Sequence, residues 1–289
     1  MDSRGSESPS DAASITPGLY LVATPIGNAD DITLRALQVL RGADVVACED
    51  TRHTGRLMQR YGIAARLIPY HDHNADDARP RLLARLAEGG RVALVSDAGT
   101  PLVSDPGFKL VREARAQGSA VTAIPGACAA VTGLQLSGLP PDRFMFAGFL
   151  PPRQSARRTA LEQLRAVPAT LLFYESPNRL ADALVDMAAV LGDRPAAVTR
   201  ELTKLFEEVV EGRLSELAAR YRNDPPKGEI VVVVGGPEAP AVDALDVDGM
   251  LAAALATSGV RDAAAAVAEV TGLPKRELYA RALTLGRRE

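Results

Sequence analysis

The chain has 289 residues, of which 47% are hydrophobic and 24% charged, and its formal net charge of −3 goes with an isoelectric point near 5.8. This composition is typical of a folded globular protein, and the length predicts two domains or one larger domain with an appendage. The acidic balance excludes a globally basic nucleic-acid binder, so any contact with nucleic acid must come from local patches, and no apolar run approaches the ~20 residues of a membrane helix.

The N-terminal segment and the cysteines indicate the compartment. Met1–Pro17 is polar, with Ser, Asp and Pro and no apolar stretch, so we expect a disordered tail and not a signal peptide. Cys48 and Cys128 stand far apart and form neither a metal-binding nor a redox spacing, which is typical of a reducing cytosol. We therefore expect a cytoplasmic protein that has no membrane partner and binds no metal.

From Gly18 onward the pattern alternates between short apolar runs and amphipathic stretches. The apolar runs predict strands over Leu19–Ala23, Asp44–Cys48, Arg66–Pro69, Arg91–Val95 and Ala120–Ile124. The stretches between them predict helices over Thr33–Arg41, Thr51–Arg60, Pro80–Glu88 and Gly107–Gln117. Such alternation implies right-handed βαβ crossovers and a mostly parallel sheet, which ends before the turn-rich stretch Gly138–Asp142.

Beyond this break the pattern changes. We expect strands over Phe144–Gly148, Ala169–Tyr174, Ala196–Arg200, Phe206–Gly212 and Glu229–Val234, and helices over Ser155–Arg165, Arg179–Leu191 and Leu214–Tyr221. The third and fourth of these strands lie close together and favour a hairpin, hence a mixed sheet. Gly235–Pro240 is expected to be a linker, and Asp248–Leu285 is expected to form three short helices, broken at Gly259 and at Thr271–Pro274.

These elements divide the chain into four parts. We expect a tail (1–17), an α/β subdomain with a parallel sheet (18–138), an α/β subdomain with a mixed sheet (139–236), and a linker with a small helical segment (237–289). In that last segment, Arg261–Val270 and Lys275–Leu283 resemble a helix-turn-helix.

Three loops rich in Gly and Pro follow strands that the pattern makes neighbours. The longest is Ser96–Gly107, and the others are Thr24–Asn28 and Pro125–Cys128. Ligands of α/β sheets bind at the carboxyl ends of strands, so these loops predict one shared crevice, although three ordinary turns remain the alternative. Neither GxxxxGK[ST] nor GxGxxG occurs, so the crevice is expected to suit an adenosine-containing cofactor without phosphate.

Several motifs along the chain resemble one family. Pro25, Ser96–Gly107, Pro125-Gly126 and Thr170–Pro177 occur in the order seen in the tetrapyrrole methylase superfamily. Within it, the chain is similar to the ribosomal RNA small subunit methyltransferase I family, which are cytidine-2'-O-methyltransferases. The motifs of this branch are Ala23-Thr-Pro-Ile-Gly-Asn28, Cys48-Glu-Asp-Thr-Arg52, Tyr70-His-Asp-His-Asn74, Ser96-Asp-Ala-Gly-Thr-Pro101, Phe173-Tyr-Glu-Ser-Pro177 and Arg200-Glu-Leu-Thr-Lys204.

The resemblance implies a fold, a cofactor and partners. It implies a tetrapyrrole-methylase-like fold of two α/β subdomains with S-adenosylmethionine in the cleft between them, a homodimer, and small-subunit ribosomal RNA or the 30S particle as substrate. Cofactor contacts are then expected at Pro25, Gly99, Thr100, Pro101, Val103, Ser104, Cys128, Ala129, Glu175, Glu201 and Glu229. Porphyrin enzymes of the superfamily usually carry Gly-Asp-Pro where this chain has Gly99-Thr-Pro101, a difference that favours the RNA branch.

Methyl transfer to a ribose 2'-hydroxyl needs alignment and a group that removes one proton. The expected catalytic residues are Lys204, Asp50 and Asp97, which lie near strand ends. Each has an ordinary alternative: Lys204 as a solvated turn cation, Asp50 as a helix cap paired with Arg52, and Asp97 as a residue that rigidifies its own loop.

Basic residues indicate where RNA would bind. The candidates are Arg52, Arg153, Arg157, Arg158, Lys275 and Arg276, which are expected to contact phosphates. A solvated charged face, or helices that only extend the fold, is the alternative at each place. Two other functions stay open: C-methylation of a tetrapyrrole precursor, and a non-enzymatic RNA-binding assembly factor.

Overall fold

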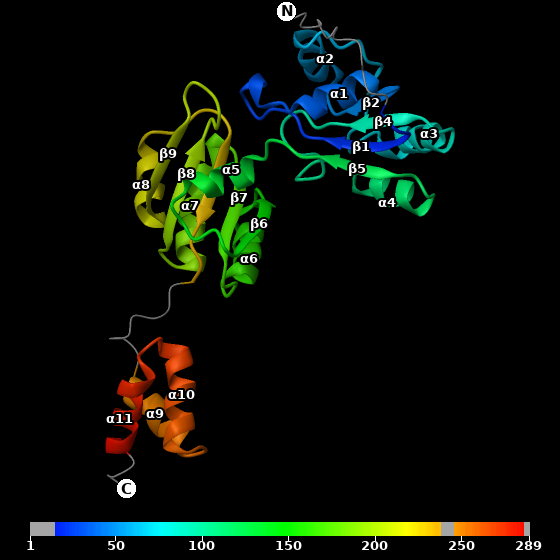
Figure 1. Cartoon of the computed structure of the whole chain (residues 1–289). Coiled ribbons are helices and arrows are strands. Elements are labelled where there is room, and N and C mark those ends of the chain that lie inside the picture. The colour runs from blue at the N-terminus through cyan, green and yellow to red at the C-terminus, as the bar shows by residue number, and fades with distance from the viewer. Residues whose placement is uncertain (1–14, 238–245, 286–289) are drawn as a thin grey trace, which may run out of the picture. The chain divides into compact units, whose positions relative to one another are not determined.

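The computed structural model describes residues 15–237 and 246–285 (Figure 1). The chain divides into two compact units, Met1–Gly235 and Gly236–Glu289. Most of the tail predicted over 1–17, and part of the predicted linker, lie outside the described residues.

The first half of the large unit is a parallel sheet covered by helices on both faces, as predicted. The strand order is β3-β2-β4-β1-β5, and every neighbouring pair is parallel. The strands are β1 (Gly18–Val22), β2 (Val45–Cys48), β3 (Leu67–Pro69), β4 (Arg91–Leu94) and β5 (Val121–Ile124). The helices are η1 (Ala29–Asp31), α1 (Leu34–Gly42), α2 (Thr51–Arg60), α3 (Ala75–Ala87) and α4 (Phe108–Ala116).

Successive strand residues feed two separate apolar clusters. Leu19 packs on the face covered by α3 and α4, whereas Tyr20 packs on the face covered by α1 and α2 (Figure 1). Because side chains alternate across a strand, a strand covered on both faces must be apolar throughout. This requirement explains why the short apolar runs predicted these strands.

The second half of the unit is a mixed sheet of order β6-β7-β10-β8-β9. Only β6 and β7 are parallel, and β8 and β9 form the predicted hairpin. The strands are β6 (Phe144–Phe149), β7 (Thr170–Glu175), β8 (Pro195–Arg200), β9 (Glu208–Arg213) and β10 (Ile230–Val234). The helices are α5 (Ala129–Leu136), α6 (Gln154–Leu164), α7 (Pro177–Leu191) and α8 (Leu214–Asn223).

Helix α5 is absent from the sequence-based expectations. It packs on β7 and β10, and a Cβ on Gly133 would lie 3.0 Å from Thr199 Oγ1 and 3.1 Å from Val231 Cβ. This glycine therefore permits a close approach of helix to sheet. Its packing groups α5 with the second sheet, although the boundary predicted at residue 138 follows it. Helix α3 also begins earlier than predicted, at Ala75, and contains Pro80.

The small unit consists of the three helices predicted for it, α9 (Val247–Leu255), α10 (Val260–Thr271) and α11 (Lys275–Leu285). Leu251, Val267 and Leu278, one from each helix, meet in a core of its own. Gly272 adopts the left-handed conformation (φ 70°) that ends α10, so α10 and α11 follow each other as a helix-turn-helix would. Over the described ranges, no helix has the length and apolar character to cross a membrane.

Candidate active site

The three glycine- and proline-rich loops meet at the carboxyl ends of the adjacent strands β4, β1 and β5. Thr24 N–H donates to Gly99 O (2.9 Å), and Gly99 N–H donates to Thr24 O (3.1 Å). Thr100 Oγ1 donates to Ala127 O (3.0 Å), which joins the Pro125–Cys128 loop to the Ser96–Gly107 loop. The loops predicted to share a crevice are thus hydrogen-bonded to one another.

Strained backbone is concentrated in two loops. Among the described residues, the non-glycine positions with positive φ are Leu102 (73°), Ser104 (65°), Glu201 (50°) and Thr203 (65°). The first two lie between β4 and α4, and the other two lie between β8 and β9. Such conformations persist only where the surroundings enforce them, and they are concentrated at ligand sites.

The β8–β9 loop lies against the β1–η1 loop, which brings the two halves of the unit together. Asn28 N–H donates to Thr203 Oγ1 (3.1 Å). A Cβ on Gly27 would lie 2.4 Å from Lys204 Cγ, so only glycine permits this approach. Ile26 packs with Leu202 in the apolar cluster under α5, which buries the junction.

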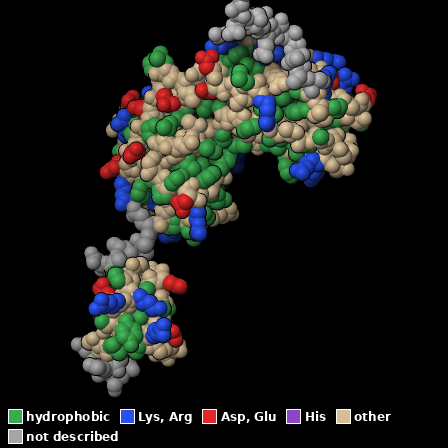
Figure 2. Space-filling model, viewed as in Figure 1, with side chains coloured by type: hydrophobic (Ala, Val, Ile, Leu, Met, Phe, Trp, Pro, Cys, Tyr) green, Lys and Arg blue, Asp and Glu red, His purple; other side chains and the backbone are tan. Residues whose placement is uncertain are grey.

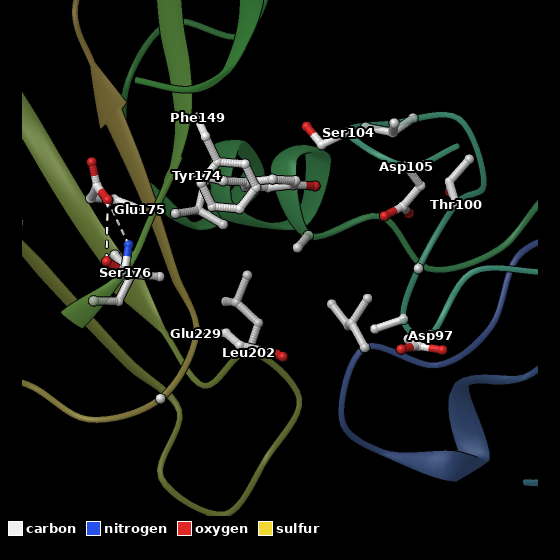
Figure 3. A pocket seen from close by; sticks show the side chains of 18 of the residues that line it. Asp97, Thr100, Ser104, Asp105, Phe149, Tyr174, Glu175, Ser176, Leu202 and Glu229 are labelled. Carbon is white, nitrogen blue, oxygen red and sulfur yellow. Dashed lines mark hydrogen bonds between the residues drawn. The ribbon is translucent and has the colours of Figure 1, made fainter. Parts of the chain in front are cut away.

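A cavity of about 400 Å³ opens beside this junction, and both halves of the unit line it (Figure 3). In the close view, Asp97, Thr100 and Asp105 stand on one side, Glu175 and Ser176 on the other, and Tyr174 and Phe149 between them. The expected cofactor residues that line it are Gly99, Thr100, Val103, Ser104, Ala129, Glu175 and Glu229. Pro25, Pro101, Cys128 and Glu201 are outside the lining, each next in sequence to a lining residue.

Glu175 is a buried acceptor on the cavity wall with unused capacity. Its Oε1 accepts Ser176 N–H (2.8 Å) and lies 3.3 Å from Arg179 Nε, whereas Oε2 has no hydrogen-bond partner within the described part of the chain. Burial raises the pKa of this carboxyl, and the Ser176 amide and Arg179 oppose the rise. A buried acceptor without a partner is costly, so a hydroxyl or amine donor of a ligand would stabilise it.

Tyr174 and Phe149 form an aromatic wall. Their ring centroids lie 5.5 Å apart in an edge-to-face arrangement, and the ring centroids of Phe146 and Tyr174 lie 4.8 Å apart in a similar arrangement. The Tyr174 hydroxyl accepts Ala130 N–H (3.2 Å), and burial raises the pKa of Tyr174 to about 12. The phenol is therefore neutral, and the wall suits a planar or apolar part of a ligand.

Lys204 is a bound cation. Its Nζ lies 2.8 Å from Glu201 Oε1 and 3.0 Å from Glu229 Oε2. Burial opposes the charge, but hydrogen bonds to both carboxylates outweigh it and raise the pKa of Lys204. The amine is therefore protonated at neutral pH, a state that cannot accept a proton from substrate.

Asp50 and Asp97 join two loops. The Asp50 side chain accepts Arg52 N–H (2.8 Å) as the cap of α2, and this amide holds the pKa of Asp50 below its ordinary value. Asp97 Oδ1 accepts Asp50 N–H (3.0 Å). Asp97 lines the cavity and Asp50 does not, so Asp50 has the capping role that sequence offered as the alternative.

Among the candidate RNA contacts, Arg157 requires a correction. Its side chain is 5% exposed, and Nη2 lies 2.6 Å from Asp186 Oδ2, a carboxylate that is fully buried. A guanidinium so enclosed is unavailable to a phosphate. Arg158 is half-exposed and also bonds Asp186 through Nε (2.7 Å), whereas Arg153 is exposed on the preceding loop.

Helix α2 presents a row of arginines that sequence did not single out as a group. Arg52, Arg56 and Arg60 are exposed and follow each other at intervals of four residues, about 6 Å along the helix axis. Arg52 is 87% exposed and pairs with Asp50 (3.4 Å), and Arg60 pairs with Asp30 (3.6 Å). In the small unit, Lys275 and Arg276 are exposed at the start of α11.

Sequence reasoning missed several lining residues. Asp105, Phe149, Tyr174, Ser176, Leu202 and Gly228 also line the cavity. Asp105 lies inside the predicted ligand loop, so the loop itself was the available signal. The others come from the second half of the unit, whose position could not be derived from local pattern.

Known families match both units. Residues 18–218 match the Tetrapyrrole (Corrin/Porphyrin) Methylases, and residues 241–286 match the RsmI C-terminal HTH domain. The chain is 54% identical to Ribosomal RNA small subunit methyltransferase I of Mesorhizobium japonicum, over 95% of this chain and 94% of that one. It is 50% identical to the protein of the same name from Escherichia coli O157:H7, over 92% and 94%.

Solved structures share the fold of the large unit. Diphthine synthase superposes with a TM-score of 0.59 at 21% identity, over 75% of this chain and 89% of that one. Uroporphyrin-III C-methyl transferase from Thermus thermophilus, complexed with S-adenyl homocysteine, gives 0.52 at 21% identity, over 75% and 96%. At this level of identity the likeness establishes the two-sheet fold alone.

Proposed function

The chain belongs to the tetrapyrrole methylases, and among them to the ribosomal RNA small subunit methyltransferase I family, and from this premise we propose that it methylates the ribose 2'-hydroxyl of a cytidine in small-subunit ribosomal RNA. It is a methyltransferase that uses S-adenosylmethionine, which supplies a methyl group on a positively charged sulfur. What we propose is the acceptor atom, the ribose 2'-oxygen, and the nucleotide that carries it, a cytidine.

The charge of the cavity is the observation that carries the proposal. Among the described residues, its charged lining residues are Asp97, Asp105, Glu175 and Glu229, all carboxylates, and the lining contains neither Lys nor Arg. Lys204 and Arg179 pair with Glu229 and Glu175 from outside the lining, so Asp97 and Asp105 keep the site negative. Such a site repels phosphate and favours a cation, and S-adenosylmethionine bears a sulfonium and an ammonium group. A volume of about 400 Å³ lies in the range of pockets for nucleoside-sized ligands.

The residues present fit the cofactor. The free Oε2 of Glu175 would accept a hydrogen bond from a hydroxyl or amine donor, and Tyr174 with Phe149 would cover an apolar face. The backbone of the Gly99–Ser104 loop, fixed by its left-handed residues, would hold the rest. By fixing the cofactor, these groups would let its methyl group be aligned with an acceptor oxygen, and alignment of this kind lowers a barrier by roughly 7–11 kcal/mol.

The same charge pattern disfavours the tetrapyrrole alternative. A tetrapyrrole precursor carries several carboxylates, and its recognition requires cations around the cavity. The lining offers carboxylates instead, which would repel that substrate. RNA, by contrast, needs cations outside the cavity, along the path of its backbone.

We propose that the RNA backbone contacts exposed arginines around the site. Arg52 stands at the start of α2, whose capping residue Asp50 donates its amide to the cavity residue Asp97. Arg56 and Arg60 continue the row away from the cavity. Further proposed phosphate contacts are Arg153 and Arg158, and Lys275 with Arg276 in the helix-turn-helix unit. Since the proposed substrate is ribosomal RNA, we also propose that the reaction takes place in the cytoplasm.

We also propose that the protein is a homodimer. Large apolar side chains are exposed on α5 (Val131, Leu136) and on the edge strand β6 (Phe144, Met145), and both elements contact β7. Figure 2 shows apolar side chains gathered on the visible face of this lobe. Such a patch favours association, and sedimentation of the wild type beside Met145→Asp tests it, with a lower mass expected for the variant.

The function is tested by transfer of label. Tritiated S-adenosylmethionine is incubated with unmethylated small subunits and with naked RNA, and the labelled nucleoside is identified by mass spectrometry. We expect 2'-O-methylcytidine. A chain lacking residues 242–289 should keep cofactor affinity but lose RNA methylation. Absence of label from both substrates would exclude an enzyme, and label on a base carbon or nitrogen would exclude ribose methylation.

A further inference from the structure

Asp105 is a carboxyl of the cavity that no cation neutralises. It follows the strained residue Ser104 and precedes Pro106 and Gly107, which fix the path of the loop into α4. Figure 3 shows its carboxylate turned toward the cavity, across from Tyr174. Among the ion pairs of the described residues, none involves Asp105.

The other lining carboxyls are already engaged. Glu229 pairs with Lys204 at 3.0 Å, Glu175 lies 3.3 Å from Arg179 Nε, and Asp97 accepts the Asp50 amide at 3.0 Å. Each of these contacts occupies a carboxylate oxygen, and the free Oε2 of Glu175 is the acceptor proposed for the cofactor. Among the described residues, neither an ion pair nor a backbone amide engages the Asp105 carboxylate, which leaves it available to a hydroxyl group in the cavity.

The surroundings of Asp105 increase its basicity. Burial is the larger cause, and the charges of Glu49, Asp97 and Asp72 act in the same direction, against a hydrogen bond with Ser96. Together they raise the pKa of Asp105 to about 6. A base is most effective when its pKa lies near the working pH, so this carboxyl is ionised yet basic at neutral pH.

We infer that Asp105 is the general base that removes the proton of the ribose 2'-hydroxyl during methyl transfer. The 2'-oxygen forms its bond to the methyl carbon while its proton passes to a carboxylate oxygen of Asp105. The bond between carbon and sulfur breaks, and its electron pair remains on sulfur, which becomes neutral. Asp105 then returns the proton to solvent. This inference rests on the proposed function, because it requires a hydroxyl acceptor.

The first test is the isosteric change Asp105→Asn in the full-length protein. We expect S-adenosylmethionine still to bind in calorimetry, with an affinity lowered only modestly, because three other carboxylates remain in the lining. The single-turnover rate of RNA methylation should fall by about 10²–10⁴-fold, the usual contribution of a general base. The acid limb of the wild-type rate profile, with a midpoint near the pKa of about 6, should disappear.

A second variant tests the electrostatic cause without altering the cavity. Asp72 is exposed and is absent from the lining, so Asp72→Asn removes one repulsive charge and leaves the site intact. The acid limb should move to lower pH while the plateau rate is unchanged. A residue with only a structural role would not produce this shift.

The outcomes separate this inference from the function on which it rests. Wild-type rates in Asp105→Asn, or an acid limb that Asp72→Asn leaves in place, overturn the assignment of the base and leave the methyltransferase standing. Abolished cofactor binding in Asp105→Asn makes Asp105 a binding residue in the first place and equally overturns it. No transfer to RNA by the wild-type protein refutes both.

Discussion

Removal of the Asp186 carboxylate should lower the stability of the large unit and leave its RNA binding unchanged. Asp186 is fully buried, and its oxygens lie 2.6 Å from Arg157 Nη2 and 2.7 Å from Arg158 Nε. Gln154 Nε2 donates a third hydrogen bond at 3.2 Å. Asp186→Asn leaves Arg157, 5% exposed, as a buried cation without a countercharge. Breaking such a pair costs about 3–5 kcal/mol.

This energy converts into a measurable melting shift. A unit of this size loses about 2–4 °C in Tm per kcal/mol, so the variant should melt about 6–20 °C below the wild type in calorimetry. The double variant Asp186→Leu with Arg157→Met should recover much of the loss, because an apolar pair of similar volume needs no countercharge. RNA binding should keep its salt dependence in Arg157→Met.

The pair also has a pH signature. Burial opposes the charge on Asp186, but hydrogen bonds from Arg158 and Arg157 outweigh it, so its pKa lies below the ordinary value. The carboxylate therefore contributes stability above the unfolded pKa of about 4, and the contribution is lost as pH falls through the lower folded value. A melting temperature of Asp186→Asn within 1 °C of wild type, or a flatter salt slope in Arg157→Met, would refute this reasoning and return Arg157 to the phosphate role.

Four further substitutions test the site and the RNA surface. Gly99→Val should abolish cofactor binding in a folded protein, because Gly99 has φ 78° and a Cβ there would lie 3.2 Å from Ile26 Cγ2; wild-type affinity in calorimetry would contradict this. Arg56→Ala and Arg60→Ala should each lower the slope of log K against log salt by about 0.7, and unchanged slopes would make the α2 row a solvated face. Lys204→Met should leave the acid limb of the rate profile in place, because a cation held by two carboxylates is no base; loss of that limb would restore the catalytic role.

The fold follows from local pattern wherever burial is complete. Parallel strands such as β4 are covered on both faces, so their apolar runs are visible without any partner. Helix α5 lacks such a signal, because it is short, mostly apolar and interrupted by Gly133, whose purpose is contact with Val231 of a strand made much later. The spacing of apolar residues alone does not identify a helix of this kind.

The same distinction applies to the site: features set by local sequence can be predicted, and features set by distant residues cannot. The Ser96–Gly107 loop is predictable because unusual backbone paths require Gly and Pro, and those residues are visible in sequence. The burial of Arg157 is not predictable from sequence, since it depends on Asp186, which lies 29 residues away on another helix. Tyr174 reaches the cavity only through the way the second sheet meets the first, a relation that no local segment encodes.

The place of β10 in the second sheet has a consequence for biosynthesis. This strand is the last of the large unit to be made, yet it lies at the centre, between β7 and β8. Until residues 230–234 leave the ribosome, β7 and β8 each present an open edge, which invites pairing with other chains. Gly228 and Glu229, which lead into β10, also complete the cavity wall. A chain that ends before β10 therefore lacks part of the cavity wall, and we expect binding of the methyl donor to begin only once this strand has been made.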